Sequence, residues 1–449
     1  MKKKISNFVC SECGYESVEW YGKCPNCGQW NTMKEFKEQR LKFKDGGRQD
    51  RNEENKPLKL SEIKTSLKQR FSSGIEEFDR VLGNGFVKAS VILLAGEPGV
   101  GKSTLLLQLV KKMSGLSILY VSGEESPEQV KGRAERLGVE GTNLLLLSET
   151  NADRIIEEFE KIDGETLVII DSIQTLWSED FESYPGSVSQ VRGCAQKLLE
   201  IGKKKGITLI LVGHVTKEGE IAGPMILSHM VDVVLFLEGE RFTELRLLRG
   251  FKNRFGPTDE VGVFKMSEKG MEEVKNPSEI FLGDRGNEAR LAKDGESRRG
   301  SVTVCAMEGT RPMLLEIQAL VAQSALAIPR RVVSGVDYNR VLLLSAVLQK
   351  ALNIPLYNQD IFVKVAGGFK ISEPAADLGI CLAIISSFKN QSLSGKICAF
   401  GEVGLLGEIR RVSGEEKRAK EAKKLGFSQV LSSVNAKSLH EVVRIINNK

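Results

Sequence analysis

The sequence has no long apolar run. None of its 449 residues belongs to a stretch approaching the roughly 20 apolar residues that span a bilayer. The basic N-terminus, MKKKISNFVC, leads into cysteines and polar residues, so it lacks the apolar centre of a secretory signal peptide. We therefore expect a cytoplasmic protein with no membrane partner, in which thiols stay reduced and paired cysteines indicate a metal site.

The sequence also lacks a strong excess of charge. Its 64 Lys and Arg against 59 Asp and Glu give a formal net charge of +5. So small an excess permits nucleic-acid binding without indicating it, because such binding depends on a local patch. An apolar content of 41% with 27% charged residues is typical of a globular protein, and the length predicts two or three domains.

Four of the eight cysteines form two C-x-x-C pairs near the N-terminus, each followed by glycine, in CSECGYESVEWYGKCPNCG. Two such pairs supply four thiolates for a tetrahedral zinc ion, which leaves no open position for catalysis. A redox dithiol would need only one pair, on a thioredoxin-like fold. We predict a structural zinc module over residues 1–33, with the Zn²⁺ ligands Cys10, Cys13, Cys24 and Cys27.

A P-loop pattern follows an apolar strand in VILLAGEPGVGKSTLLLQLV, residues 91–110, and precedes a helical pattern. This is the strand–loop–helix context that the motif requires. Its glycines allow backbone amides to wrap phosphates, and the helix N-terminus adds its positive end. Lys102 is expected to reach the β- and γ-phosphates of ATP, Ser103 to hold Mg²⁺ and Thr104 to lie near the α-phosphate. The predicted loop consists of Gly96, Glu97, Pro98, Gly99, Val100, Gly101, Lys102, Ser103 and Thr104.

Three further apolar strands end on polar residues, and their alternation with helical patterns predicts an open α/β sheet. Asp171 ends TLVIID and is the expected Walker B carboxylate, which organises the Mg²⁺ water shell. Glu124 in SILYVSGEES is our choice for polarising the attacking water. A surface acid is the alternative, and it applies more strongly to Glu125. His214 ends ITLILVGH and is either a sensor of hydrolysis or a hydrogen-bonded structural histidine.

A basic segment lies between two alternating patterns, TELRLL and PTDEVGVFKM. Its position predicts a hairpin tip in solvent over residues 249–256, RGFKNRFG. Such a tip usually carries small turn formers, whereas this one carries three cations around Phe251 and Phe255: Arg249, Lys252 and Arg254.

These parts together resemble the RecA-like ATPases. FSSGIEEFDRVLGNGF is similar to that family's lead-in, and SGEESPEQ resembles the segment that bears the catalytic glutamate of hexameric replicative helicases. The resemblance assigns that role to Glu124 and implies ATP bound between subunits. KNRFGP resembles the Lys-x-Arg hairpin of the same helicases, so Lys252 and Arg254 are expected to act in trans on the γ-phosphate. A basic hairpin lying along DNA phosphates is the alternative.

The same resemblance implies DNA at the centre of a ring, held by two loops near residues 177–193 and 215–228. Arg192 and Lys217 are the candidate phosphate contacts, and Tyr184 is a candidate for stacking on a base.

After a hinge at 281–300, residues 301–449 resemble the proteolytic domain of Lon proteases, which use a Ser–Lys dyad. Here Ala375 occupies the place of the serine, and the closest register puts Glu416, with Lys417 adjacent, at the lysine. Without the hydroxyl no acyl-enzyme can form by this mechanism. We expect an inactive protease fold that assembles a ring and offers basic residues to double-stranded DNA: Arg330, Arg331, Arg340, Lys364, Arg410 and Arg411.

The predicted order is thus the zinc module, a charged linker at 34–60, a RecA-like ATPase domain at 61–280, the hinge and a mixed α/β domain. The whole chain is similar to a bacterial family of DNA recombination and repair ATPases. The resemblance implies a homohexameric motor on single-stranded and branched DNA that promotes branch migration with a recombinase partner. A signalling ATPase that does not move on DNA and an ATP-dependent protease are the alternatives, and Ala375 argues against the second.

Overall fold

The computed structural model describes residues 7–10, 16–17, 19–26, 28–36, 69–140, 143–162, 164–214, 224–239, 244–282 and 299–447. Its contacts divide the chain into two units. The first contains Met1–Gly239, Arg246–Thr258 and Phe264–Glu273, and the second contains Glu240–Leu245, Asp259–Val263 and Val274–Lys449. Much of the predicted linker and hinge lies outside the described residues, so those boundaries stay predictions. No helix in the described part of the chain combines the length and apolarity that a membrane crossing requires.

The N-terminal module is a small antiparallel sheet in the order β2-β1-β3, formed by Asn7–Cys10 (β1), Glu16–Ser17 (β2) and Met33–Phe36 (β3). Cys10 and Cys24 are buried and pack with Met33. Gly28 has a φ of +70°, and its amide donates to the carbonyl of Cys24, which closes a tight turn between these two residues. The other two predicted ligands, Cys13 and Cys27, lie outside the described residues.

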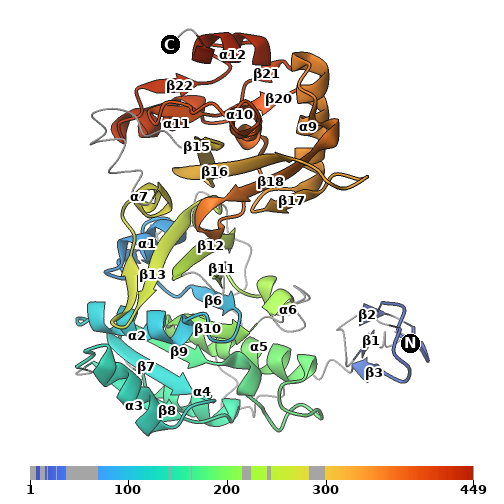
Figure 1. Ribbon diagram of the computed structural model, residues 1–449. Helices are drawn as coiled ribbons and strands as arrows, with labels where there is room; N and C mark the ends of the chain where they lie inside the picture. The colour runs from blue at the N-terminus through green and yellow to red at the C-terminus, as the bar shows by residue number, and fades with distance from the viewer. Residues whose placement is uncertain are drawn as a thin grey trace, which may run out of the picture. The chain divides into compact units, whose positions relative to one another are not determined.

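The ATPase core is a nine-stranded sheet in the order β14-β13-β12-β11-β6-β10-β9-β7-β8 (Figure 1). The six strands from β11 to β8 are parallel, whereas β11 pairs antiparallel with β12 and β13 with β14. The strands are Val91–Gly96 (β6), Ser117–Ser122 (β7), Leu144–Ser148 (β8), Thr166–Asp171 (β9), Thr208–His214 (β10), Val233–Glu238 (β11), Leu245–Asn253 (β12), Val261–Ser267 (β13) and Gly270–Glu273 (β14).

Helices cover both faces of this sheet, which explains why its central strands are continuously apolar. Alternate residues of β6 point to opposite faces: Ile92 and Leu94 join one apolar cluster, and Val91 and Leu93 join the other. The first cluster contains residues of Glu76–Leu82 (α1), Lys102–Lys112 (α2) and Pro127–Arg136 (α3), and the second of Ala152–Glu160 (α4), Val188–Lys205 (α5) and Pro224–Ser228 (α6). The predicted open α/β sheet is therefore confirmed.

Helix starts follow local capping rules. Ser126 and Gln129 form a capping box at α3, and the Ser187 side chain accepts from the amide of Gln190 at α5.

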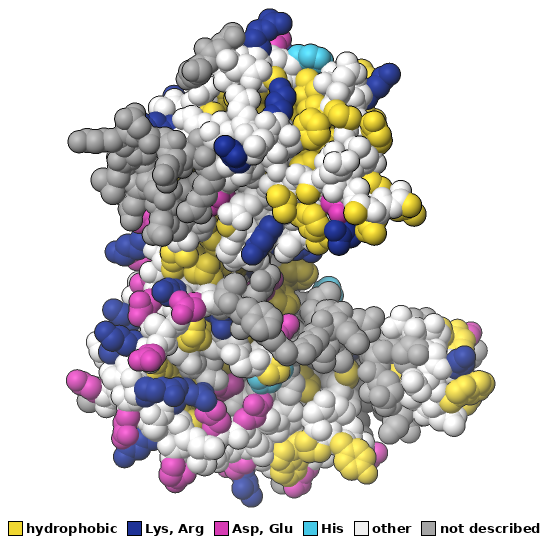
Figure 2. Space-filling model, in the orientation of Figure 1, with side chains coloured by type: hydrophobic (Ala, Val, Ile, Leu, Met, Phe, Trp, Pro, Cys, Tyr) yellow, Lys and Arg dark blue, Asp and Glu magenta, His cyan; other side chains and the backbone are white. Residues whose placement is uncertain are grey.

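The solvent face of the ATPase unit around α2 and α3 carries charges of both signs (Figure 2). One example is the α3 pair Lys131–Glu135, with nitrogen and oxygen 3.8 Å apart. These exposed pairs add little to stability.

The hairpin prediction is wrong in its extent. β12 continues to Asn253, so Arg249 and Phe251 are strand residues, and only the connection after Asn253 lies outside the strands. Phe251 packs edge-to-face on Phe236 of β11, with ring centroids 5.7 Å apart. Alternating aromatic and cationic residues suit an exposed strand as well as a tip, which explains the error. The connection to β13 spans residues 254–260 and contains the late signal Gly256-Pro257.

The C-terminal unit contains a six-stranded mixed sheet in the order β17-β18-β16-β15-β19-β22 (Figure 1). Its strands are Ser301–Glu308 (β15), Arg311–Gln323 (β16), Arg331–Ser334 (β17), Gln359–Val365 (β18), Ile397–Ala399 (β19) and Gln429–Leu431 (β22). The helices are Pro277–Leu282 (α7), Tyr338–Leu352 (α9), Asp377–Phe388 (α10), Glu415–Lys424 (α11) and Leu439–Asn447 (α12). The short strands Glu402–Val403 (β20) and Ile409–Arg410 (β21) form a separate hairpin. This architecture confirms the predicted mixed α/β class.

At the protease-like turn, the structure places a side chain of α11 other than Glu416 or Lys417. Ala375 is buried in the short helix Pro374–Ala376 (η5), which directly precedes α10. Glu416 and Lys417, however, are exposed on α11. The α11 side chain that reaches this turn is Arg418, which is fully buried and donates to both oxygens of Glu373, at 2.7 and 2.6 Å. An arginine stays protonated in proteins, so Arg418 cannot act as the general base of a dyad.

Replacing Arg418 by Met is expected to lower the free energy of unfolding by about 3 kcal/mol, because Glu373 would lose its bidentate partner in a poorly solvated site. Denaturant unfolding of the full chain measures the change. Lys417→Met is the matched control, since this neighbouring side chain is exposed and its replacement should cost under about 0.5 kcal/mol. Equal losses in the two variants would contradict the assignment.

Candidate ATP-binding and catalytic site

The P-loop connects β6 to α2, as the sequence predicts. Gly99 and Gly101 have φ values of +77° and +112°, which side-chain-bearing residues rarely adopt. Gly96 meets a different constraint, because a Cβ there would lie 2.5 Å from the carbonyl oxygen of Leu237 in β11. With α2 beginning at Lys102, the loop amides and the helix N-terminus face the same site, and this arrangement fits a triphosphate.

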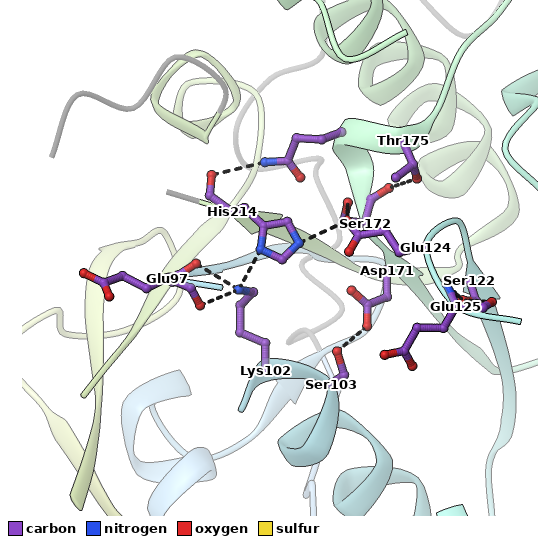
Figure 3. Close-up of polar contacts among 12 residues, drawn as sticks. Glu97, Lys102, Ser103, Ser122, Glu124, Glu125, Asp171, Ser172, Thr175 and His214 are labelled. Carbon is purple, nitrogen blue, oxygen red and sulfur yellow. Dashed lines mark hydrogen bonds and ion pairs between the residues drawn. The ribbon is translucent and has the colours of Figure 1, made fainter. Parts of the chain in front are cut away.

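Lys102 folds back onto the loop that contains it. Its Nζ donates to the carbonyl oxygens of Gly96 at 2.8 Å and Glu97 at 3.0 Å, and it lies 3.1 Å from Nδ1 of His214 (Figure 3). Burial lowers the pKa of Lys102 to about 8, although Asp171 and Glu124 act to raise it. The ammonium thus has three partners within the protein.

The ends of α2 and β9 bring two oxygen ligands together. The Ser103 hydroxyl donates to Oδ2 of Asp171 at 2.6 Å, and the Tyr120 hydroxyl donates to the same oxygen at 2.5 Å. Burial and the Asp171 charge raise the pKa of Tyr120 well above its usual range, so the phenol remains a donor. Hydroxyl and carboxylate oxygens are the ligands that Mg²⁺ prefers, so this donor set fits a magnesium ion beside the P-loop.

The two glutamates after β7 have different surroundings. Oε1 of Glu124 accepts from the Ser172 hydroxyl at 2.5 Å and lies 3.1 Å from Nε2 of His214 (Figure 3). Glu125 instead forms an ion pair with Arg133 of α3 at 2.5 Å. Glu124 therefore belongs to the site, whereas Glu125 is tied to a helix, and this favours our choice of Glu124.

His214 bridges Lys102 and Glu124. An ammonium can only donate, so Nδ1 of His214 accepts from Lys102 and its Nε2–H is available to the Glu124 carboxylate. The Gln174 side chain donates to the His214 carbonyl at 3.2 Å, and its buried Oε1 has no hydrogen-bond partner among the described residues. His214 thus links the P-loop lysine to the first glutamate after β7.

Sequence reasoning missed Tyr120, Ser172 and Gln174. Tyr120 has a signal in the sequence, a hydroxyl within an otherwise apolar strand, and Ser172 directly follows the Walker B carboxylate. Which carboxylate each hydroxyl meets depends on strand register, since Ser122 at the end of β7 pairs with Asp171 at the end of β9.

The cations of the predicted trans site lie far from the P-loop of the same chain. Lys252 Nζ donates to the carbonyls of Ser228 at 2.6 Å and Val231 at 2.9 Å, and burial together with Arg254 lowers its pKa. Arg254 pairs with Asp232 at 3.2 Å. Asp232 also accepts a hydrogen bond from the amide of Val91, the first residue of β6. The P-loop follows Gly96, the last residue of β6, so the two cations and the P-loop lie at opposite ends of this strand.

The candidate DNA loops are shorter than predicted. Ser187 caps α5, so residues 188–193 are helical, and Arg192 is an exposed residue of this helix. Tyr184 remains in the loop with 88% of its surface exposed. In the second loop, residues 224–228 form α6, and Lys217 falls in 215–223, outside the described residues.

Most of the basic residues predicted to contact double-stranded DNA have acidic partners in the C-terminal unit. Arg330 pairs with Asp360, Arg340 with Asp377, Arg410 with Glu402 and Glu408, and Arg411 with Glu415. Arg331 donates to the Leu356 carbonyl, and Lys364 is exposed on β18. Structural ion pairing therefore accounts for four of the six.

A P-loop after a central strand, a carboxylate at the end of β9 and helices on both faces of the sheet define a P-loop ATPase with a RecA-like core. A family model described as an AAA domain matches residues 55–220. A model described as a rubredoxin metal binding domain matches residues 8–35, which confirms a metal-binding module there. A third, subunit ChlI of Mg-chelatase, matches residues 335–435.

The chain is 49% identical over 435 residues to a DNA repair protein RadA of Bacillus subtilis, covering 96% of this chain and 93% of the relative. It is 48% identical over 434 residues to the RadA of Halalkalibacterium halodurans, with the same coverage. Among solved structures, the RadB recombinase is 26% identical with a TM-score of 0.37, covering 45% of this chain and 99% of that one. The chain belongs to the RadA family of DNA repair proteins.

The lowered pKa of Lys102 predicts how ATP binding depends on pH. Bound phosphate holds the proton on Lys102, whereas the free site loses it above about pH 8, so the complex binds more protons than the free protein. Affinity should fall by up to about tenfold per pH unit above that value. Titration with a fluorescent ATP analogue from about pH 7 to about pH 9.5 measures this.

Lys102→Arg is the control, because arginine keeps its charge over this range and should remove the slope whatever its absolute affinity. A wild-type affinity that stays constant to the alkaline end would contradict the prediction.

Proposed function

We propose that this chain is the subunit of a homohexameric, DNA-dependent ATPase in the cytoplasm. It moves on single-stranded DNA and promotes branch migration of recombination intermediates during DNA repair, together with a recombinase. Membership of a family whose relatives are named DNA repair proteins supports the repair role. The structural observation that supports a ring-shaped ATPase motor is the position of Lys252 and Arg254 in the sheet.

These two cations lie at the wrong end of the sheet to serve their own nucleotide. β6 contains six residues, so at about 3.3 Å per residue its ends are roughly 17 Å apart. Lys252 lies opposite Val234 near the start of β11 in the strand pairing. Arg254 forms an ion pair with Asp232, the residue just before β11. In a ring, this edge of one subunit can face the P-loop of the next. Cations there would stabilise the charge that develops on the γ-phosphate.

Within one subunit, the residues divide the work of hydrolysis. Lys102 would leave its carbonyl partners to hold the β- and γ-phosphates, and Glu124 would polarise the attacking water. Ser103 and Asp171 would hold Mg²⁺, which when bound neutralises charge on the β- and γ-phosphates. His214 touches both Lys102 and Glu124, so it can pass a change at the phosphates to the segment that follows β10.

The N-terminal module is proposed to hold a structural zinc ion through Cys10, Cys13, Cys24 and Cys27. The burial of Cys10 and Cys24 supports this, because four closed ligands leave little solvent at the metal. In the C-terminal unit, Ala375 and Arg418 support an inactive protease fold.

Steady-state ATP hydrolysis should be stimulated by single-stranded DNA, and Lys102→Ala should abolish both the basal and the stimulated rate. Tyr184→Ala should reduce the stimulated rate more than the basal rate, because this exposed side chain is remote from the P-loop in sequence and lies in a candidate DNA loop. Hydrolysis indifferent to DNA, by a chain that also fails to bind DNA, would favour the signalling ATPase.

A shared site predicts complementation between inactive chains. Mixing Lys102→Ala with Lys252→Ala should restore part of the ATPase activity, since some interfaces then combine an intact P-loop with an intact Lys252. The Lys252→Ala chain alone should still bind ATP, which shows that loss of the Ser228 and Val231 contacts has not unfolded it. No recovery in the mixture, with only DNA affinity changed in Lys252→Ala, would place the cations on DNA instead.

A further inference from the structure

Tyr120 reaches the candidate magnesium site from inside the core. It lies on β7, two residues before the end of the strand, and only 2% of its surface is exposed. Its ring belongs to the apolar cluster that includes Leu105 and Leu109 of α2 and Val130 of α3. The hydroxyl alone leaves this layer, and it donates to Oδ2 of Asp171 at 2.5 Å.

The same carboxylate oxygen accepts from two hydroxyls of different character. Ser103 belongs to the P-loop helix and is itself a predicted Mg²⁺ ligand, so its hydrogen bond is part of the site that changes on binding. Tyr120 is fixed by its packed ring, and a tyrosine side chain has few torsions through which to move. It therefore supplies Asp171 with a donor that is held by core packing and not by the P-loop.

We propose that Tyr120 is a positioning residue for the magnesium site: its hydroxyl holds the Asp171 carboxylate in the orientation that Mg²⁺ binding requires. The role rests on the proposed ATPase function. Partners of this kind, which hold a ligand without touching the metal, typically contribute a factor of about 10 to 100 in metal affinity or activity. A phenylalanine would fill the same core space and leave Oδ2 to Ser103 alone.

The test measures nucleotide binding by the full-length Tyr120→Phe chain with a fluorescent ATP analogue. In excess EDTA its affinity should equal that of the wild type, because the P-loop amides and Lys102 are untouched. With Mg²⁺ titrated in, the concentration that gives half of the metal-dependent gain in affinity should rise about 10- to 100-fold. This readout does not require hydrolysis, and thermal unfolding shows whether the variant is folded.

Thr208→Val is the matched control. Thr208 is the first residue of β10, at the opposite end of the strand from the site, and its side chain is buried. The substitution removes its hydroxyl, which accepts a hydrogen bond from the amide of Ala89. Its Mg²⁺ titration should coincide with that of the wild type. Coincidence of Tyr120→Phe with the wild type would overturn the proposal. So would an equal loss of affinity in EDTA and in Mg²⁺, which indicates a purely structural role.

The wild-type titration separates this proposal from the proposed function. A wild-type chain that binds and hydrolyses MgATP, with a Tyr120→Phe chain that has unchanged Mg²⁺ dependence, removes the role of Tyr120 and leaves the ATPase standing. A wild-type chain that neither gains nucleotide affinity with Mg²⁺ nor hydrolyses MgATP overturns both.

Discussion

The parallel pairing of β6, β7, β9 and β10 is the constraint on which the ATPase site depends. Parallel strands bring their carboxyl ends to one edge, so the P-loop, Glu124, Asp171 and His214 meet although they are far apart in sequence. The register is exact enough that His214 lies opposite Gly96 across β10 and β6. Apolar packing on both faces of the sheet holds this edge in place, and the polar network of the site is built on it.

The same pairing explains what can and cannot be predicted from the sequence. A polar residue at the end of an apolar strand can be recognised from the sequence alone, which is why the sequence indicates Asp171, Glu124 and His214. Their hydrogen-bond partners are not visible, because the contacts of Tyr120 and Ser172 with these carboxylates depend on how neighbouring strands are aligned. The extent of the 249–256 tip is equally hidden, because its alternation is compatible with a strand, and pairing with β11 decides the matter.

The protease-like unit shows the same limit in a helix. The sequence places Ala375 at the turn without difficulty, because a Pro-Ala-Ala run before an apolar helix has a clear register. The closest alignment puts Glu416 at the partner position on α11, although burial at Glu415, Arg418 and Ala422 follows the helical period. In a helix so rich in charge, only tertiary contact with Glu373 distinguishes the buried arginine from its exposed neighbours.

The folded-back position of Lys102 has a consequence for turnover. All three hydrogens of its ammonium already have acceptors, the carbonyls of Gly96 and Glu97 and the imidazole of His214. An arriving triphosphate therefore exchanges one set of hydrogen bonds for another, and the net gain is smaller than the new contacts alone suggest. After hydrolysis the same three acceptors compete for the lysine again. If Lys102 holds the phosphates as proposed, these internal acceptors weaken its hold on ATP and on the hydrolysis products alike, so neither is bound as tightly as an unpartnered lysine would bind it.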